Sequence, residues 1–405
     1  MKNKRKIILT SESVNIGHPD KTCDYIADCF LDSALEQDAN SQMAVECAIK
    51  DDLFMIYGEA TTTAKIDYEK IARAALKQIG YNNEFRIVKQ ISEQSPDIWN
   101  AVHNDTPHDG DCINKVSAVD TGAEGGATNK NITGVNGAVQ SLPLCANDQG
   151  IVYGYATNET PEYMPLPILL AHKLMRKYEE FRKERNDFFP DAKCQVSIEY
   201  ENNLPKRVVT VLMSVSHSES CDNLTIKNMI ENYVIIPVLA EYPKIDRKNM
   251  EMIINPSGKI TIWGSFGDSG CVGRKIVVDT YGGIGRVGGG CFSSKNATKV
   301  DRSGAYYARY VAKNIVANKM ADKCEIQVGY GIGLARPLAI NIECFGTEKE
   351  DINKIYEYVD KNFDFSPANI IKELDLLKPI YKHTSCYGHF GRPEFPWEKI
   401  VGNIG

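Results

Sequence analysis

Charged side chains border a glycine-rich stretch in the second half of the chain. Residues 279–295 read DTYGGIGRVGGGCFSSK, and the charged residues around this run are Asp268, Arg274, Lys275, Arg286, Lys295, Lys299 and Asp301. Backbone N–H groups of glycine turns and basic side chains bind phosphate oxygens, and carboxylates bind Mg²⁺. The pattern is typical of a site for a polyphosphate with its Mg²⁺. A glycine hinge among solvated charges is the other interpretation.

The same run contains a literal G-x-G-x-x-G, Gly283–Gly288, after the strand-like residues 275–279. A dinucleotide site needs a helix that begins within the motif and an acidic residue about 20 positions further on, at the end of the next strand. No helical pattern starts before Asp301, so an NAD(P)-dependent oxidoreductase stays only as an alternative. A Walker A loop is excluded, because Gly289 stands where that motif requires lysine.

A second candidate anion site lies near the N-terminus. The residues Gly17-His-Pro-Asp-Lys21 directly precede a run of apolar residues at helical spacing. Proline suits the first position of a helix, and a helix N-terminus attracts anions. His18 and the helix N-terminus would then face an anion together, although a His-Pro pair before a helix more often acts only as a cap.

The hydrophobic periodicity predicts how these residues are positioned. Helices are expected over residues 23–35, 67–79, 165–185, 224–239, 301–319, 350–362 and 367–377, and strands over 44–49, 53–57, 86–91, 194–200, 207–215, 259–263, 274–279, 325–332 and 338–345. Single helices alternate with hairpins, which indicates an α+β fold rather than a βαβ series. Residues 103–146 keep neither period and are interpreted as a long loop, a kind of segment that is usually functional or disordered.

The composition limits the possible partners and compartment. The chain has 405 residues, 43% of them hydrophobic, a formal charge of −6 and twelve scattered cysteines. Its net charge gives no attraction to nucleic acid or to anionic membranes. The cysteines form no C-x-x-C pair, and the N-terminus lacks the apolar stretch of a signal peptide. We therefore expect a cytoplasmic protein with reduced thiols, no membrane segment and no nucleic-acid partner.

Separated motifs over nearly the whole chain resemble the S-adenosylmethionine synthetase (methionine adenosyltransferase) family. The first motifs are Thr10-Ser-Glu-Ser-Val14, Gly17-His-Pro-Asp-Lys21, Gly58-Glu-Ala-Thr-Thr62, Gln94-Ser-Pro-Asp-Ile98, Asp148-Gln-Gly150 and Pro190-Asp-Ala-Lys193. The later ones are Asn255-Pro-Ser-Gly258, Gly267-Asp-Ser-Gly270, Gly288-Gly-Gly-Cys-Phe-Ser-Ser-Lys295, Lys299-Val-Asp-Arg-Ser303, Tyr387-Gly-His-Phe-Gly-Arg392 and Phe395-Pro-Trp-Glu-Lys399.

The resemblance implies an α+β fold of three similar domains with approximate threefold pseudosymmetry, mixed sheets and helices on one face of each sheet. On this basis we expect an N-terminal domain over 1–102, an enlarged active-site lid over 103–146, a central domain over 147–262 and a C-terminal domain over 263–405. A homodimer with active sites between its subunits, and in some cases a tetramer, is implied. The implied reaction joins ATP and L-methionine to give S-adenosylmethionine, and the released triphosphate is then hydrolysed to phosphate and diphosphate.

The resemblance also assigns roles to single residues. The implied catalytic residues are His18, Lys193, Asp268, Arg274, Lys275 and Lys295. These also contact ATP, together with Asp148, Asp191, Lys259, Ile260 and Cys291. Methionine would be bound by Glu59, Gln94, Asp268 and Lys299. Asp20 and Asp301 would each hold Mg²⁺, with two ions per site, and Glu46 would hold K⁺.

Some positions depart from the family pattern. Ile260 stands where an aromatic side chain usually stacks on adenine, Asn147 replaces a glycine, and the family has a much shorter segment at residues 103–146. A non-catalytic, nucleotide-binding relative that supports a partner synthetase is therefore a further alternative. The retained cations and carboxylates favour an active enzyme.

Overall fold

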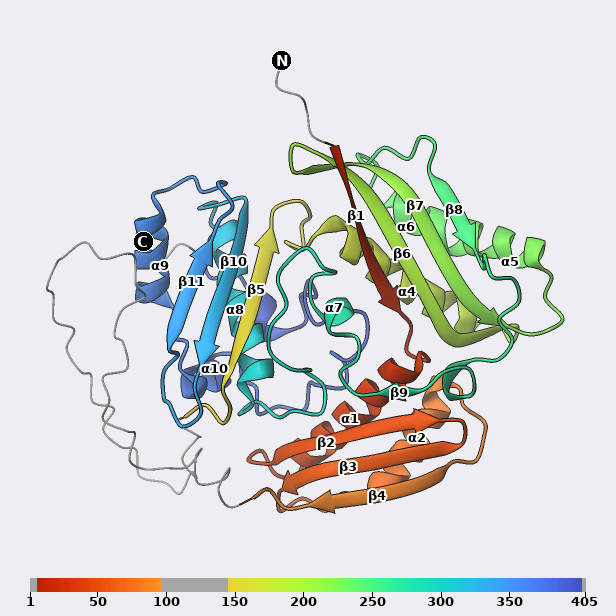
Figure 1. Cartoon of the computed structure of the whole chain (residues 1–405), viewed down its shortest axis with the longest axis horizontal. Helices are drawn as coiled ribbons and strands as arrows, with labels where there is room; N and C mark the ends of the chain where they lie inside the picture. Colours follow the sequence, from red (N-terminus) through yellow and green to blue (C-terminus); the bar gives the residue numbers. More distant parts are fainter. Residues whose placement is uncertain (1–5, 96–144, 403–405) are drawn as a thin grey trace, which may run out of the picture.

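Three β-sheets, each covered on one face by helices, make up the protein (Figure 1). The computed structural model describes residues 6–95 and 145–402. The first sheet has the strand order β1 (Lys6–Val14), β6 (Phe188–Glu201), β7 (Leu204–His217) and β8 (Glu251–Ile254). The second has the order β4 (Arg86–Ser92), β3 (Leu53–Thr61), β2 (Gln42–Lys50) and β9 (Gly270–Cys271). The third has the order β11 (Ala339–Glu343), β10 (Lys323–Tyr330) and β5 (Gly150–Thr157).

Each sheet includes one strand from a distant part of the chain. Strand β1 pairs antiparallel with β6, β5 with β10, and the short β9 with β2. Strands β4 and β8 pair in parallel with their neighbours. The first and second sheets are therefore mixed, whereas the third is wholly antiparallel. The predicted α+β class is confirmed. Pairing of these distant strands brings together residues that are some 200 positions apart in the sequence.

Three long helices cover the sheets and form the centre of the molecule (Figure 1). Helix α1 (Pro19–Leu35) packs on β2, α4 (Leu166–Lys183) packs on β1 and β6, and α8 (Val300–Ala317) packs on β5 and β10. The shorter helices are α2 (Tyr68–Ile79), α5 (Asn223–Ile230), a π-helical turn (Glu231–Ile235), α6 (Ile236–Ala240), α7 (Ile276–Asp279), α9 (Ile352–Asn362) and α10 (Pro367–Glu373).

The contact between α8 and β5 depends on one glycine. A Cβ at Gly154 would lie 2.0 Å from the Ala308 carbonyl carbon, so only glycine lets the helix approach this strand. Apolar residues of α1, α8 and the C-terminal segment that ends near Trp397 share one large core. A second core lies between α4, the helices after residue 222 and the β6–β7 hairpin. The two cores hold the three sheets around a common centre.

Most of the predicted elements are present, and two predicted strands are wrong. Residues 259–263 form a loop, in which Ile260 N donates to His217 Nε2. Residues 274–279 contain the short helix α7, because the N–H of Asp279 bonds to the Lys275 carbonyl instead of to a neighbouring strand. Strands β1, β5, β8 and β9 were not predicted. Strand β5 contains Gly150 and Gly154, which lower its strand propensity.

Two sequence predictions concern surface and loop properties. The predicted loop and lid at 103–146 falls almost entirely outside the described residues.

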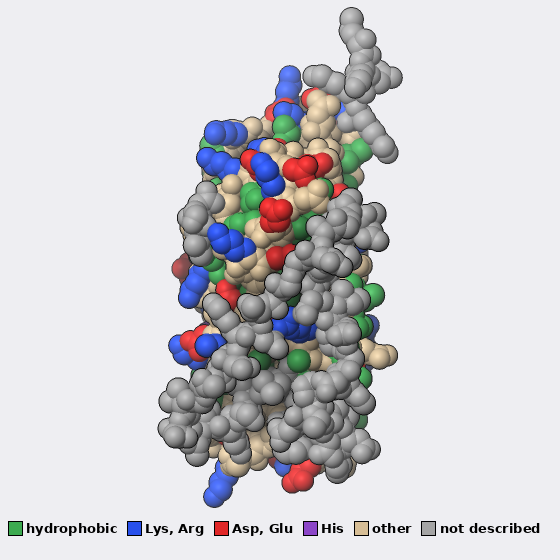
Figure 2. All heavy atoms as spheres, turned by 90° about the vertical axis from the view of Figure 1, so that its left-hand side faces the viewer, with side chains coloured by type: hydrophobic (Ala, Val, Ile, Leu, Met, Phe, Trp, Pro, Cys, Tyr) green, Lys and Arg blue, Asp and Glu red, His purple; other side chains and the backbone are tan. Residues whose placement is uncertain are grey.

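Basic and acidic side chains are interspersed on the face shown in Figure 2, in keeping with the small net charge. Among the helices of the described residues, none is both long and apolar enough to cross a membrane.

Candidate active site

The N-terminus of α1 forms one half of the predicted site. His18 caps the helix, and its Nδ1 accepts the N–H of Asp20 at 3.2 Å, as the sequence suggested. The Asp20 carboxylate accepts hydrogen bonds from Lys275 Nζ at 2.6 Å and from Cys271 N at 3.0 Å, and Arg274 Nε lies 3.7 Å away. Pairing of β9 with β2 thus places residues 271–275 against the start of the first helix.

Burial and neighbouring cations determine the protonation of this half. Burial, with Lys275 and Lys193 nearby, lowers the pKa of His18 to about 3. Its ring is therefore neutral at physiological pH and can accept or donate a hydrogen bond without carrying charge. Burial raises the pKa of Asp191 to about 6, against the opposing effects of the Gly264 N–H and Lys193.

These contacts and electrostatic effects join seven predicted residues, which we call the His18 group. Asp191 and Lys193 come from β6, and Asp268 influences both His18 and Asp191. The members of the His18 group are His18, Asp20, Asp191, Lys193, Asp268, Arg274 and Lys275. It combines four groups that can bind phosphate oxygens with three carboxylates.

The other predicted residues form a second cluster around Lys295. Lys295 Nζ donates to Asp301 Oδ2 at 2.6 Å. Burial lowers the pKa of Lys299, while the nearby carboxylates of Glu59, Asp148 and Asp301 act in the opposite direction. Cys291 is close to Lys295 and Glu46, and burial raises its pKa to about 11. Gln94 is close in the fold, because its N–H donates to Thr61 Oγ1, two residues from Glu59 on β3. We call this cluster the Lys295 group; its members are Glu46, Glu59, Gln94, Asp148, Cys291, Lys295, Lys299 and Asp301.

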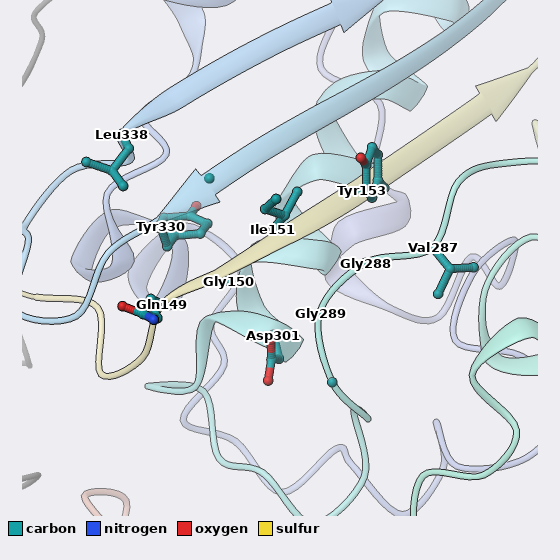
Figure 3. Close-up of a pocket in the computed structure, with 12 residues that line it drawn as sticks. Gln149, Gly150, Ile151, Tyr153, Val287, Gly288, Gly289, Asp301, Tyr330 and Leu338 are labelled. Carbon is teal, nitrogen blue, oxygen red and sulfur yellow. The ribbon is translucent and has the colours of Figure 1, made fainter.

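Gly288, Gly289 and Gly290 of the glycine-rich run line one edge of an open hollow of about 790 Å³ (Figure 3). Ile151 and Tyr153 of β5 line one side, and Asp301 lies beside Gly289 at its foot (Figure 3). A Cβ at Gly290 would lie 2.5 Å from Lys295 Nζ, so the missing side chain makes room for the ion pair of Lys295. No helix follows the G-x-G-x-x-G motif until α8 begins at Val300, which argues against the dinucleotide interpretation.

A buried ion pair anchors the segment that carries Lys295. Both guanidinium NH groups of Arg302 in α8 donate to the Asp28 carboxylate of α1 at 2.8 Å, and both side chains are fully buried. The same carboxylate accepts the hydroxyl of Ser293 and the N–H of Ser294, each at 3.0 Å. Arg302 also donates to the Lys295 carbonyl. The position of Lys295 therefore depends on contacts between α1 and α8.

The two groups lie at different places along strand β2. Cys271, next to the His18 group, pairs with Ala48, whereas Lys295 pairs with Ala44. Four residues of a strand span about 13 Å. Within residues 6–95 and 145–402, no hydrogen bond or ion pair joins a member of one group to a member of the other.

Comparison with known proteins decides the family. Residues 6–107, 143–260 and 262–399 match the N-terminal, central and C-terminal domains of S-adenosylmethionine synthetase. The chain belongs to the S-adenosylmethionine synthetase family. It is 45% identical to the S-adenosylmethionine synthase of Clostridium botulinum over 98% of this chain and 97% of the relative. It is 42% identical to that of Sorangium cellulosum, over 98% and 88%, and 43% identical to that of Clostridium tetani, over 97% of each.

Membership of this family establishes the reaction class. The chain is an S-adenosylmethionine-forming transferase, and the oxidoreductase alternative is not favoured. The family is metal-dependent, and the arrangement of carboxylates fits this requirement. In the described ranges, no three His, Cys, Asp or Glu side chains converge on one point. A Mg²⁺ ion held by one or two carboxylates and by substrate phosphates needs no such cluster.

The structure brings one further charged side chain of this synthetase beside the His18 group. Glu12 of β1 lines a hollow of about 300 Å³ together with Arg274 and Lys275. It lies within the Thr10–Val14 motif, but its charge gave no reason to place it beside residues 274–275. Pairing of β1 with β6 and the position of α7 create this proximity. Lys259 pairs with exposed Glu219 at 3.7 Å, and Ile260 lies beside His217.

Proposed function

We propose that this protein forms S-adenosylmethionine at a site shared between two copies of the chain. The His18 group of one copy would hold the triphosphate of ATP, and the Lys295 group of the other would hold methionine. The observation that carries this proposal is that the predicted residues divide into two groups. Their segments pair with β2 at Ala48 and Ala44, about 13 Å apart along the strand. Sulfur and C5′ must come to within about 3–3.5 Å of each other for reaction.

The residue types suit the chemistry of this transfer. The thioether sulfur of methionine is neutral and attacks C5′ in line, so no general base is needed. Charge develops instead on the triphosphate that leaves, and positioned donors stabilise it. Lys193, Arg274 and Lys275 supply positive charge, and neutral His18 offers a hydrogen bond near the leaving oxygen. Lys295 of the other copy would complete the cation set, and the bound triphosphate is then hydrolysed to phosphate and diphosphate.

The Lys295 group suits an amino acid. Glu59 would pair with the ammonium group of methionine and Lys299 with its carboxylate. The electrostatic influence of Glu59 on Lys299 supports this pairing, because it shows that the two side chains are near each other. Among residues 6–95 and 145–402, the buried Gln94 Oε1 atom has no hydrogen-bond partner, and it would accept a hydrogen bond from methionine. Asp268 would contact both substrates from the His18 group.

Carboxylates in both groups are available to cations. Asp20 and Asp301 each pair with a lysine, Lys275 and Lys295 respectively, and would hold two Mg²⁺ ions together with phosphate oxygens. Glu46 accepts a hydrogen bond from Tyr57 and would hold K⁺. Bound Mg²⁺ neutralises the charge of the triphosphate, whereas the lysines and arginine position it.

One open sheet face supports the pairing of two copies. Ala48, Met55 and Val88 are aligned across β2, β3 and β4 in the sheet register. Met55 and Val88 are 40% and 43% exposed, on the face opposite α1 and α2. Burial of this apolar row against a second copy would remove it from water, and it lies beside Glu46 and Glu59. We infer an isologous dimer through this sheet.

The basic experiment incubates the purified protein with ATP, methionine, Mg²⁺ and K⁺. We expect S-adenosylmethionine by mass spectrometry and methionine-dependent release of phosphate and diphosphate. A folded oligomer that forms no product under these conditions would contradict the function. An absorbance change on addition of nicotinamide cofactor would instead support the oxidoreductase.

The shared site is tested by mixing two inactive variants, His18→Ala and Glu59→Ala. Each homodimer lacks one half of both sites. A heterodimer has one intact site, so random exchange of subunits should restore about a quarter of the parent activity, from the statistics of an isologous dimer. A mixture of His18→Ala with Lys193→Ala, both in the His18 group, is the matched control and should stay inactive. If the first mixture also stays inactive although mass spectrometry detects heterodimers, each site lies within one chain.

A further inference from the structure

The first residues of β6 display three different side chains on the open face of the sheet. Phe189 and Asp191 are partly exposed and Lys193 is exposed, whereas the alternating Phe188, Pro190 and Ala192 are buried. The alternation persists through the register irregularity between Phe188 and Ala192. An aromatic ring, a carboxylate and an ammonium group thus follow one another on one face at two-residue steps.

A column of aromatic rings supports Phe189. Its ring stacks on Trp263, with centroids 5.9 Å apart and planes inclined by 27°. Trp263 in turn packs on Tyr81 at 4.7 Å. Tyr81 is buried, so the column runs from the core to the partly exposed Phe189. The residue after Trp263, Gly264, donates its N–H to Asp191 at 2.9 Å, which ties the column to the His18 group.

The loop after β8 packs against the end of β7, close to the first residues of β6. His217 pairs with Phe188 at the end of β7, and its N–H bonds to the Ile260 carbonyl at 2.9 Å. Ile260 is partly buried and Ile262 is exposed, so this loop offers apolar surface to a ligand next to Trp263, which stacks on Phe189. Solvation of such a surface is unfavourable unless a ligand covers it.

The order and spacing of the three side chains match a nucleoside triphosphate. Two-residue steps along a strand are about 6.6 Å each, so Phe189 and Lys193 lie about 13 Å apart. With phosphate on Lys193, a ribose hydroxyl can donate to the Asp191 carboxylate, and the base reaches Phe189. An aromatic ring binds a flat heterocycle by stacking, whichever hydrogen bonds the base also makes.

We propose that the ring of Phe189, supported by Trp263, is the surface on which the adenine base of ATP stacks. This inference rests on the proposed function, since it takes the His18 group as the triphosphate site. It assigns a substrate-binding role to two aromatic residues and explains why Phe189 remains partly exposed while Phe188 is buried.

The test compares ATP with inorganic triphosphate, which has no base. Binding of each, with Mg²⁺, is measured by calorimetry for the parent protein, Phe189→Leu, Trp263→Leu and Phe189→Tyr. Loss of one base–aromatic stack should weaken ATP binding about 5- to 150-fold in the leucine variants. Triphosphate affinity should stay within about twofold of the parent. Phe189→Tyr keeps the ring and should bind ATP as the parent does.

A stacked pair elsewhere provides the matched control. Tyr233 is exposed and stacks on Phe181 at 6.0 Å and 21°, on the helical side of the same sheet. Tyr233→Leu should change neither affinity. Unchanged ATP binding in folded Phe189→Leu, or an equal loss for ATP and triphosphate, would overturn the inference.

The same measurements separate this inference from the proposed function. If the parent forms no S-adenosylmethionine but the leucine variants lose ATP affinity selectively, the function fails and the stacking surface stands. If product forms and base-dependent binding is unchanged in the variants, the function stands and the stacking surface is wrong.

Discussion

Asp28 offers a sharp test of what positions the Lys295 group. Its carboxylate is fully buried and pairs with Arg302 through two hydrogen bonds of 2.8 Å. Asp28→Asn removes the negative charge and leaves the guanidinium buried without a counter-ion. Breaking a buried ion pair in this way costs about 3–5 kcal/mol. At about 2.1 cal/mol/K of unfolding entropy per residue, 405 residues give about 0.85 kcal/mol/K. The melting temperature should therefore fall by about 4–6 °C.

Calorimetry at fixed protein concentration measures this change, because association also affects the melting temperature. Glu350→Gln is the control, since Glu350 pairs with Lys354 on the surface at 3.3 Å and such pairs contribute about 0–1 kcal/mol. The double variant Asp28→Asn/Arg302→Met removes both charges and should be more stable than the sum of the single changes predicts. A melting temperature of Asp28→Asn within 1 °C of the parent, or strict additivity in the double variant, would refute the reasoning.

Two further predictions concern the site directly. Gly290→Ala adds a Cβ that would lie 2.5 Å from Lys295 Nζ and 2.9 Å from Asp301 Oδ2, so kcat should fall at least tenfold with little loss of fold. The control Gly402→Ala, whose Cβ would meet nothing within 4 Å, should have the kcat of the parent. Equal kcat values for the two variants would contradict this role of Gly290. The pKa of His18 is about 3 in the folded protein and about 6.5 in the unfolded chain, so the unfolded chain binds the proton first as pH falls. Between pH 7 and pH 5 this costs the folded state about 2 kcal/mol. Urea midpoints at both pH values should show a smaller loss for His18→Gln than for the parent, and an equal loss would contradict the neutral, buried ring.

Elements whose signals lie within one short segment could be predicted from the sequence. The helix after His18 could be predicted because proline, a capping side chain and helical apolar spacing all occur within one short segment. Residues 274–279 have β-branched side chains that favour a strand, but no partner strand from the described part of the chain lies beside them, and they contain α7 instead. Strand β5 could not be predicted, because Gly154, which lets α8 approach, lowers the strand propensity of the segment that contains it.

The sequence by itself determined the class of chemistry: glycines, cations and carboxylates in a fixed order indicated a triphosphate and an amino acid, and the motifs indicated the family. The tertiary structure alone decided which of these residues meet. Strands β1, β5 and β9 each join a sheet formed by a distant part of the chain, which creates the His18 group, brings Glu12 beside Arg274 and leaves the Lys295 group apart. Such contacts depend on strand pairing and on burial across hundreds of positions, and no local pattern of residues records them.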